Sequence, residues 1–305
     1  MSAATATKAS GRTPFKKWCD ENVGLFFLIP WIIGFLVFKV YPFASSLFYS
    51  FTDMNFFKGI HQYGIMNYVE IFTDKATTTS LLITFKYAFI TVPLKLVFAL
   101  FIAYILNFKI KFVNLFRTIY YIPSILGGSV AIAVLWRALF RDDGVINTLL
   151  GYMGIQGPSW LADRSWALFI ICLLRVWQFG SAMVLFLAAL KGVSADLYEA
   201  ATIDGAGPMR ILVSIILPAI RAAMIVVALF LFITLWNDLL QQTTYIDNPD
   251  KYTIAIGLSM FRSGLKADWA KIMCATCMAF VPGVLIYLVG QRYFVEGIVM
   301  TGMKN

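Results

Sequence analysis

The segment LLITFKYAFITVPLKLVFALFIAYIL, residues 81–106, is continuously apolar apart from Lys86 and Lys95. A helix rises about 1.5 Å per residue, so about 20 such residues cross the hydrocarbon core of a bilayer. The segment does not alternate between apolar and polar residues, as a strand of a membrane barrel would. It therefore predicts a transmembrane helix.

Five further stretches have the same character, so the chain is predicted to be an all-α membrane protein with six transmembrane helices. The composition agrees, because 60% of the residues are apolar and only 13% are charged, against about 25% charged in soluble domains. The predicted spans are Val23–Phe43, Leu81–Leu106, Ile119–Phe140, Trp166–Leu190, Ala222–Leu240 and Ile272–Tyr293. Kinks are predicted at the prolines inside spans, which are Pro30, Pro93, Pro123 and Pro282.

The distribution of Lys and Arg between the loops predicts the orientation. If the N-terminus is cytoplasmic, the inside segments together with Arg292 hold 12 basic residues and the outside segments hold 8. The positive-inside rule then places residues 1–22 and 294–305 in the cytoplasm and residues 23–293 in the cytoplasmic membrane. The net charge of +9 faces anionic lipid headgroups, so no nucleic-acid partner is needed to explain it.

The residues that usually bind metals or catalyse reactions are sparse. His61 is the only histidine, and Cys274 and Cys277 lie inside a predicted span, where packing is their expected role. We therefore expect no metal site, no bound cofactor and no disulfide framework. An intramembrane enzyme would need His, Asp or Cys residues clustered within the spans, so that class of function is disfavoured.

The longest inside loop, residues 191–218, predicts a short helix outside the membrane. Ser194 suits the N-cap, Asp196 the first turn and Gly205 the C′ position. Three-and-four spacing places four residues on one face, which two alanines make flat: Leu197, Ala200, Ala201 and Asp204. From the residues alone, this helix fits either a simple connector or a docking element for a soluble partner.

The same loop resembles the EAA signature of the permease subunits of ABC importers. The pattern E-A-A-x3-G-x9-I-x-L-P is matched without a gap by Glu199, Ala200, Ala201, Gly205, Ile215, Leu217 and Pro218. The resemblance covers essentially the whole chain and points to the sugar-type subgroup of binding-protein-dependent permeases. It implies that the loop, including Asp204, is a coupling helix that docks into an ABC ATPase subunit.

The resemblance also implies a carbohydrate cargo, an extracytoplasmic solute-binding protein and a second permease subunit. The first half of the chain resembles one of the two non-identical permeases of such importers, and the last third resembles the other. Both a different chain and a second copy therefore remain open as the permease partner. The chain has no G-x-x-x-x-G-K-[ST] loop, so ATP hydrolysis is expected on a separate subunit and this chain is not expected to be an enzyme.

A charged residue deep inside a span marks a candidate substrate pathway. Arg175 lies roughly 13 Å into its span, where facing lipid would cost at least about 2.5–3.5 kcal/mol. Together with Trp177 and Gln178 it forms a candidate wall of planar polar and aromatic groups for a sugar. Lys95, at a comparable depth, is the competing candidate. The alternative role for Arg175 is a structural charge pair or hydrogen-bond network between spans.

Other intramembrane features have simpler interpretations. Four charged residues fall near span ends, where snorkelling or interfacial pairing is expected: Lys39, Lys86, Arg137 and Asp238. The glycines of Gly127-Gly128-Ser129 predict close helix packing, with a hinge as the alternative.

The alternative function is a self-sufficient secondary transporter or channel for a small polar solute. A secondary transporter is expected to show inverted repeats and several buried carboxylates for ion coupling. Asp238 is the only acid within a predicted span, which favours the importer subunit.

Overall fold

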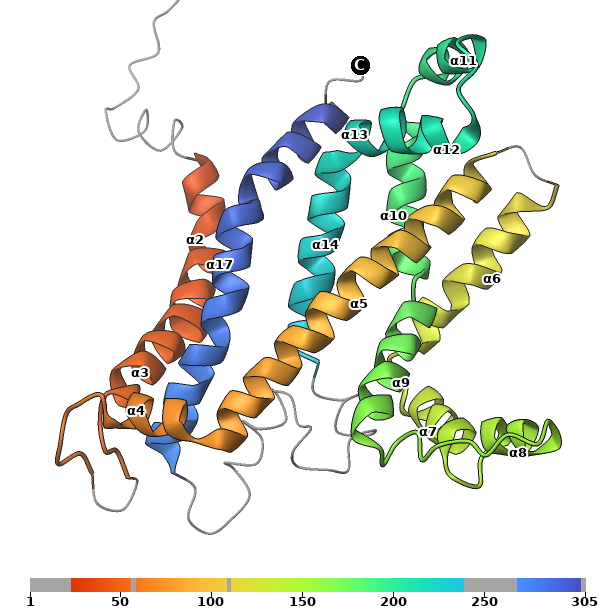
Figure 1. Ribbon diagram of the computed structural model, residues 1–305. Coiled ribbons are helices and arrows are strands. Elements are labelled where there is room, and N and C mark those ends of the chain that lie inside the picture. The colour runs from red at the N-terminus through yellow and green to blue at the C-terminus, as the bar shows by residue number, and fades with distance from the viewer. Residues whose placement is uncertain (1–22, 56–58, 109–110, 239–267, 303–305) are drawn as a thin grey trace, which may run out of the picture.

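The computed structural model describes residues 23–55, 59–108, 111–238 and 268–302, which form helices without any β-strand. Long helices run between two ends of the molecule (Figure 1). By length and composition, three helices can each cross a membrane alone, and three bent helix pairs raise the total to as many as six. The predicted all-α membrane class is confirmed, and six spans result if each bent pair is one span.

The helices fall into long apolar segments and short connecting ones. In chain order they are α2 (Val23–Phe35), η1 (Leu36–Val40), α3 (Tyr41–Ser50), α4 (Met66–Thr73), α5 (Lys75–Asn107), α6 (Val113–Leu126), α7 (Val130–Phe140), α8 (Val145–Tyr152), α9 (Arg164–Trp177), α10 (Gly180–Lys191), α11 (Ala195–Ile203), α12 (Pro208–Ile211), η2 (Leu212–Ile216), α13 (Leu217–Ala219), α14 (Arg221–Trp236) and α17 (Trp269–Gly302). The segments η1 and η2 are π-helical turns. Each of the four intramembrane prolines lies inside a helix that continues past it.

Several observed helices extend beyond the predicted spans. The first continues to Ser50, and α5 begins at Lys75, one turn or more before the predicted start. Asp74 fixes that start, because its carboxylate accepts hydrogen bonds from the backbone N–H groups of Ala76 and Thr77. Residues 1–22, the last two residues of the predicted fifth span and the end of the C-terminal tail lie outside the described residues.

Two of the predicted spans, the third and the fourth, are bent, and another bend lies just before the predicted start of the fifth span at Ala222. The axes of α6 and the α7–α8 segment differ by 95°, so the prediction of a continuous helix over Ile119–Phe140 is wrong. The chain turns at the two glycines before Ser129, whose hydroxyl accepts a hydrogen bond from the backbone of Ile132. Smaller bends of 46° and 76° separate α9 from α10 and α12–α13 from α14.

Figure 1 shows that the start of α2, the end of α5, the start of α6, α11 and the end of α17 lie at one end of the molecule. The segments α4, α7 and α8 lie at the other end. This arrangement agrees with the division of the loops that the basic residues predict.

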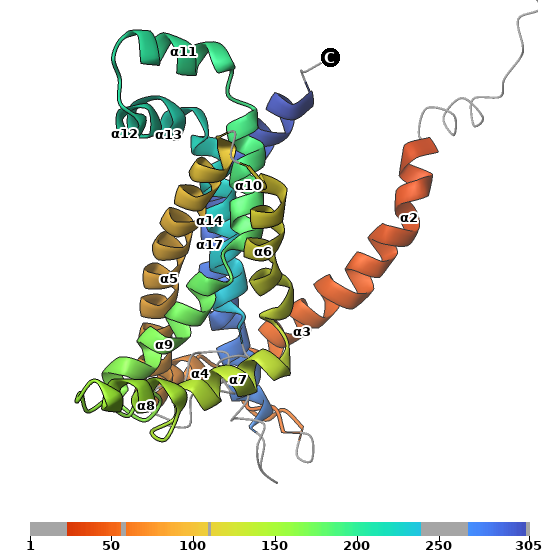
Figure 2. The same ribbon diagram turned by 90° about the vertical axis from the view of Figure 1, so that its right-hand side faces the viewer.

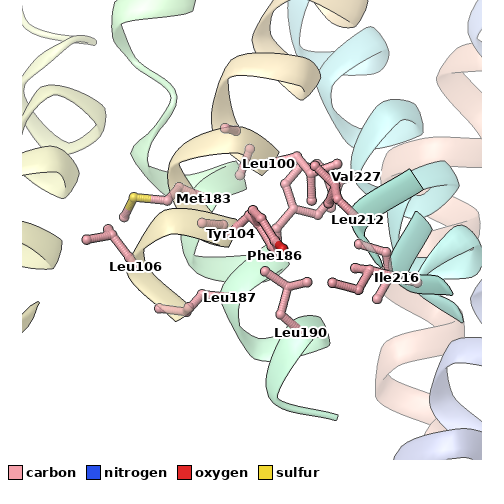
Figure 3. Packing of buried hydrophobic residues seen from close by; sticks show 14 of the residues in the cluster. Leu100, Tyr104, Leu106, Met183, Phe186, Leu187, Leu190, Leu212, Ile216 and Val227 are labelled. Carbon is pink, nitrogen blue, oxygen red and sulfur yellow. The ribbon is translucent and has the colours of Figure 1, made fainter. Parts of the chain in front are cut away.

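The largest hydrophobic core joins α5 and α10 to the loop segments that follow α11. Leu100 and Tyr104 of α5 pack with Phe186 and Leu190 of α10 and with Ile216 of η2 (Figure 3). In contrast, α2 has no buried residue and stands apart from the bundle in Figure 2. The loop is therefore packed against the spans, whereas α2 is not.

Candidate functional site

A cavity of about 260 Å³ lies where α5, α6, α9, α10 and α14 meet. Its polar wall consists of Lys95, Ser124, Arg175, Gln178, Ser181 and Thr234. Phe230 contributes an aromatic ring to the apolar side of the same cavity. Two residues that the sequence offered as competing candidates, Lys95 and Arg175, therefore line one site.

Arg175 is held by a buried ion pair with Asp238. The Arg175 Nε atom also donates to Asp238 Oδ2 at 3.1 Å and to the hydroxyl oxygen of Tyr87 at 3.3 Å. The Tyr87 hydroxyl donates in turn to the same carboxylate oxygen at 3.3 Å. The structure thus shows the charge pair between spans that was the alternative role for Arg175, and the side chain also lines the cavity.

The expected exposure of Asp238 requires a correction, although its position just after the end of α14 at Trp236 agrees with the predicted span end. The sequence placed it at a span end with interfacial pairing, but its side chain is only 6% exposed. Burial of a carboxylate is tolerated here because the Arg175 guanidinium and the Tyr87 hydroxyl surround it. The sequence did not reveal this pairing, because Arg175 and Asp238 are 63 residues apart.

Gln178 connects the bend between α9 and α10 to α6. Its Nε2 atom donates to the carbonyl oxygen of Gly127 at 3.1 Å, and its Oε1 accepts from Arg175 Nη1 at 3.1 Å. A Cβ atom on Gly127 would clash with the Gln178 side chain, so this glycine permits the contact. The expectation of close packing at Gly127 is confirmed, and the chain also bends there.

Ser124 satisfies backbone groups that the same bend leaves free. Its hydroxyl donates to the carbonyl oxygen of Gln178 at 3.1 Å and accepts from the backbone N–H of Ser181 at 3.0 Å. In a membrane such groups need a protein partner, since water is not available. A serine on α6 therefore stabilises the break in the neighbouring span.

Trp177 does not line the cavity. Its ring stacks on Trp136, with 5.9 Å between the ring centroids. The predicted wall of Arg175, Trp177 and Gln178 is therefore wrong in its aromatic member, and Phe230 lies there instead. Residues two apart on a helix point in different directions, whereas residues three apart, such as Arg175 and Gln178, share a face.

The helix in the predicted coupling loop is α11, and both of its ends fall where the sequence placed them. Ser194 occupies the N-cap position, although its side chain makes no capping hydrogen bond. Asp196 lies in the first turn, and Gly205 has a φ of 74°. The glycine therefore adopts the left-handed conformation that ends the helix, as expected for the C′ position.

The face of α11 that was expected to be flat is divided between core and solvent. Ala201 is 6% exposed and packs in the large hydrophobic core, whereas Ala200 is exposed. The expectation that both alanines lie on a free surface is therefore wrong for Ala201. Of the other residues in the pattern, Glu199, Asp204, Gly205 and Pro218 are exposed, and Ile215 and Leu217 are half-buried.

Two hydrogen bonds attach the loop to the end of α5. The Tyr104 hydroxyl donates to the carbonyl oxygen of Pro208 at 2.9 Å. Asn107 Nδ2 donates to the Tyr198 hydroxyl of α11 at 3.4 Å. These contacts join residues that are 104 and 91 positions apart, so local spacing in the sequence could not reveal them.

The family model described as binding-protein-dependent transport system inner membrane component matches residues 95–298. The chain belongs to this family. The match confirms the resemblance of this chain to binding-protein-dependent permeases. The protein is therefore a transport permease.

Sequence and fold similarity to individual proteins supports this assignment. The permease is 47% identical over 201 residues to the probable ABC transporter permease YesP of Bacillus subtilis, with 65% of each chain aligned. It is 33% identical to the lactose transport permease LacF of Rhizobium radiobacter, over 64% of this chain and 66% of that protein. A solved bacterial ABC transporter involved in import of the acidic polysaccharide alginate shares the fold, with a TM-score of 0.74 at 21% identity over 96% of this chain and 100% of the other.

Proposed function

We propose that this permease forms the transmembrane pathway of an ATP-driven importer for a sugar or related carbohydrate. A solute-binding protein delivers the cargo from outside, and a separate ATPase docks on α11 at the cytoplasmic end. The observation that carries the proposal is the EAA segment itself, which forms a helix projecting from one end of the bundle and is bonded to α5. A carbohydrate cargo is supported by the relatives, one of which is named for lactose transport.

The basic residues support the orientation of this proposal. The end that carries α11 is also the end of the bundle with the larger number of Lys and Arg residues in the predicted loops. Cytoplasmic segments carry this excess in membrane proteins. Glu199 and Asp204 are exposed on α11 and offer carboxylates to basic groups of an ATPase.

Movement of α11 reaches the cavity through α5 and α10. An ATPase that changes its shape displaces α11, and the Tyr104 and Asn107 hydrogen bonds carry the displacement to α5. The hydrophobic core that contains Ala201 carries it to α10. Both helices line or border the cavity, and the bends at α6–α7 and α9–α10 allow their halves to reorient.

The ion-coupled alternative needs a carboxylate that can exchange ions with the solution. Asp238 was its one candidate, and it is committed to Arg175 and does not line the cavity. The importer subunit is therefore the function that the geometry favours.

The test is co-purification of the ATPase with α11 variants, together with solute-stimulated ATP hydrolysis in reconstituted vesicles. Ala200→Asp places a charge on the exposed side of α11 and should weaken docking at least about tenfold, because a desolvated charge without a partner costs more than about 1.4 kcal/mol. Gly205→Val should uncouple hydrolysis by a separate route, since a β-branched residue is strained at a φ of 74°.

Ala195→Asp is the matched control, because an acidic residue in the first turn of a helix is favourable. It should retain both ATPase binding and coupling. If Ala200→Asp and Gly205→Val both bind the ATPase and couple hydrolysis to uptake as the parent does, α11 is a connector and the proposal fails.

A further inference from the structure

The charges that line the cavity do not balance. The positive charge of Arg175 is neutralised by Asp238, with which it forms a buried ion pair. Lys95 lines the same cavity and is only 6% exposed. Within the described parts of the chain, no carboxylate lies within 4.0 Å of the Lys95 amino group. Among the described residues, the Lys95 amino group therefore has no carboxylate partner in this cavity.

Lys95 cannot relieve this charge by reaching the membrane surface. It lies 12 residues before the end of α5 at Asn107, which is roughly 18 Å along the helix axis. A lysine side chain snorkels only when it is close to a helix end. A buried ammonium group without a counter-charge is costly, so the position of Lys95 in a cavity wall indicates that a bound group supplies the charge.

We propose that the cavity binds the singly charged acidic group of an acidic sugar, with Lys95 as its ion-pair partner. This inference rests on the proposed function and names the class of cargo. One negative charge balances the wall, whereas a phosphate monoester carries about −1.5 to −2 at neutral pH and would leave an excess. A carboxylate or a sulfonate therefore fits better than a phosphate.

The rest of the wall suits the neutral part of such a sugar. Hydroxyl groups of Ser181 and Thr234 line the cavity beside Gln178 and can hydrogen-bond with sugar hydroxyls. The Phe230 ring is 54% exposed and offers an apolar face to the sugar ring. Arg175 is already bonded to three side chains, so Lys95 is the cation available to the ligand.

The test uses the purified importer complex without its solute-binding protein, so that selectivity of the binding protein does not enter. Calorimetric titration compares glucuronate, glucose and glucose 6-phosphate, which differ only at C6. We expect glucuronate to bind at least tenfold more tightly than glucose, and glucose 6-phosphate to bind more weakly than glucuronate. Lys95→Met should remove the preference for glucuronate and Lys95→Arg should retain it. The control Lys86→Met alters an exposed lysine of the same helix and should change nothing.

Three results would overturn the inference. The first is the absence of a glucuronate preference over glucose in the parent complex, whether both sugars bind or neither does. The second is tighter binding of glucose 6-phosphate than of glucuronate. The third is a Lys95→Met complex that assembles and still prefers glucuronate to glucose, which would show that Lys95 is not the ion-pair partner. If Lys95→Met does not fold, the comparison of glucuronate with glucose on the parent complex still tests whether the cavity prefers an acidic sugar. Failure of the proposed function is distinguishable, because the ATPase would then not co-purify before any sugar is added.

Discussion

Helix α5 and the continuous helix formed by α2, η1 and α3 are equally apolar in their central parts, but the protein encloses only one of them. In α5, 44% of the most apolar 18-residue stretch is buried, whereas in the first helix the corresponding share is 0%. Apolar character therefore identifies both as membrane helices but does not say which one the protein surrounds.

The pattern of polar residues distinguishes the enclosed helix α5 from α2. A line of hydroxyl-bearing and charged side chains, all buried, runs along α5 at intervals of three or four residues: Thr77, Ser80, Thr84, Tyr87, Thr91 and Lys95. The sequence of α2 has no such line. Polar groups in a bilayer avoid lipid and face the bundle interior, so a polar stripe marks the buried side of a membrane helix.

The largest expected effect comes from breaking the ion pair beside α5. Asp238→Leu leaves Arg175 charged and buried without its partner and should destabilise the protein by about 3–5 kcal/mol. The double variant with Arg175→Leu should recover much of that loss. Lys39→Leu, which removes an exposed charge from the first helix, should change the stability by less than about 0.5 kcal/mol. The measurement is denaturant unfolding in detergent, and equal losses for Asp238→Leu and Lys39→Leu would contradict the comparison.

The second largest difference in stability between variants of the two helices should come from a change of side-chain volume. Ala88 of α5 is 0% exposed, so Ala88→Leu overpacks the core and should cost about 1–3 kcal/mol. At Gly34 of α2 an added Cβ meets no atom within 4 Å, so Gly34→Leu should be nearly neutral. Thermal melting of both variants in the same detergent tests this. A strong effect at Gly34 in the isolated permease would show that the first helix is packed after all.

A smaller effect is expected where α5 meets the loop that contains α11. Tyr104→Phe removes the hydrogen bond to Pro208 without changing the packing and should cost about 0.5–1.5 kcal/mol. It should also lower the solute-stimulated ATP hydrolysis of the complex. Tyr41→Phe changes a tyrosine of the first helix that is 71% exposed and should alter neither quantity. Unchanged coupling in Tyr104→Phe would mean that the loop acts on the spans by another route.

The smallest effect concerns the start of α5. Hydrogen bonds from the Thr77 hydroxyl and from backbone N–H groups lower the pKa of Asp74 from its ordinary value of 3.8. Because the folded-state pKa is lowered, the stabilisation is present at neutral pH and is lost as the pH falls below 3.8 through the lowered pKa. Asp74→Ala should cost about 0.5 kcal/mol at pH 7, since the cap is partly solvated. Asp74→Asn should retain the cap and lose its pH dependence, as unfolding measured at pH 3 and pH 7 can show.

Local signals in the sequence predicted the helical class and the ends of α11, because capping depends on residues close together in the chain. The predicted span begins at Leu81 and omits the Thr-rich start of α5. Hydropathy favours apolar residues, so it does not detect a polar first turn that a capping residue stabilises. The buried line of polar residues on α5 was visible as a three-and-four spacing and could have identified Tyr87 as an interior residue.

The ion pair of Arg175 and Asp238 could not be predicted from such local patterns. Tyr87, Arg175 and Asp238 come from three segments that meet only after the spans pack together, and separations of 63 and 88 residues leave no local pattern. The positions of the bends depend equally on contacts between spans. The close approach of Gly127 and Gln178 is an example, because neither residue alone specifies it.

The pairing of Arg175 with Asp238 also determines how this region responds to the electrical potential across the membrane. A single charge that crosses the whole field performs work of about 2.3 kcal/mol per 100 mV. Two opposite charges joined in an ion pair move together, so their contributions cancel wherever the helices carry them. Shifts of α9 and α14 during transport should therefore be electrically silent. Any change in ATP-driven turnover when a potassium gradient and valinomycin impose a voltage should therefore come from other charges, such as Lys95 or a charged cargo, and should persist in the double variant Arg175→Leu with Asp238→Leu.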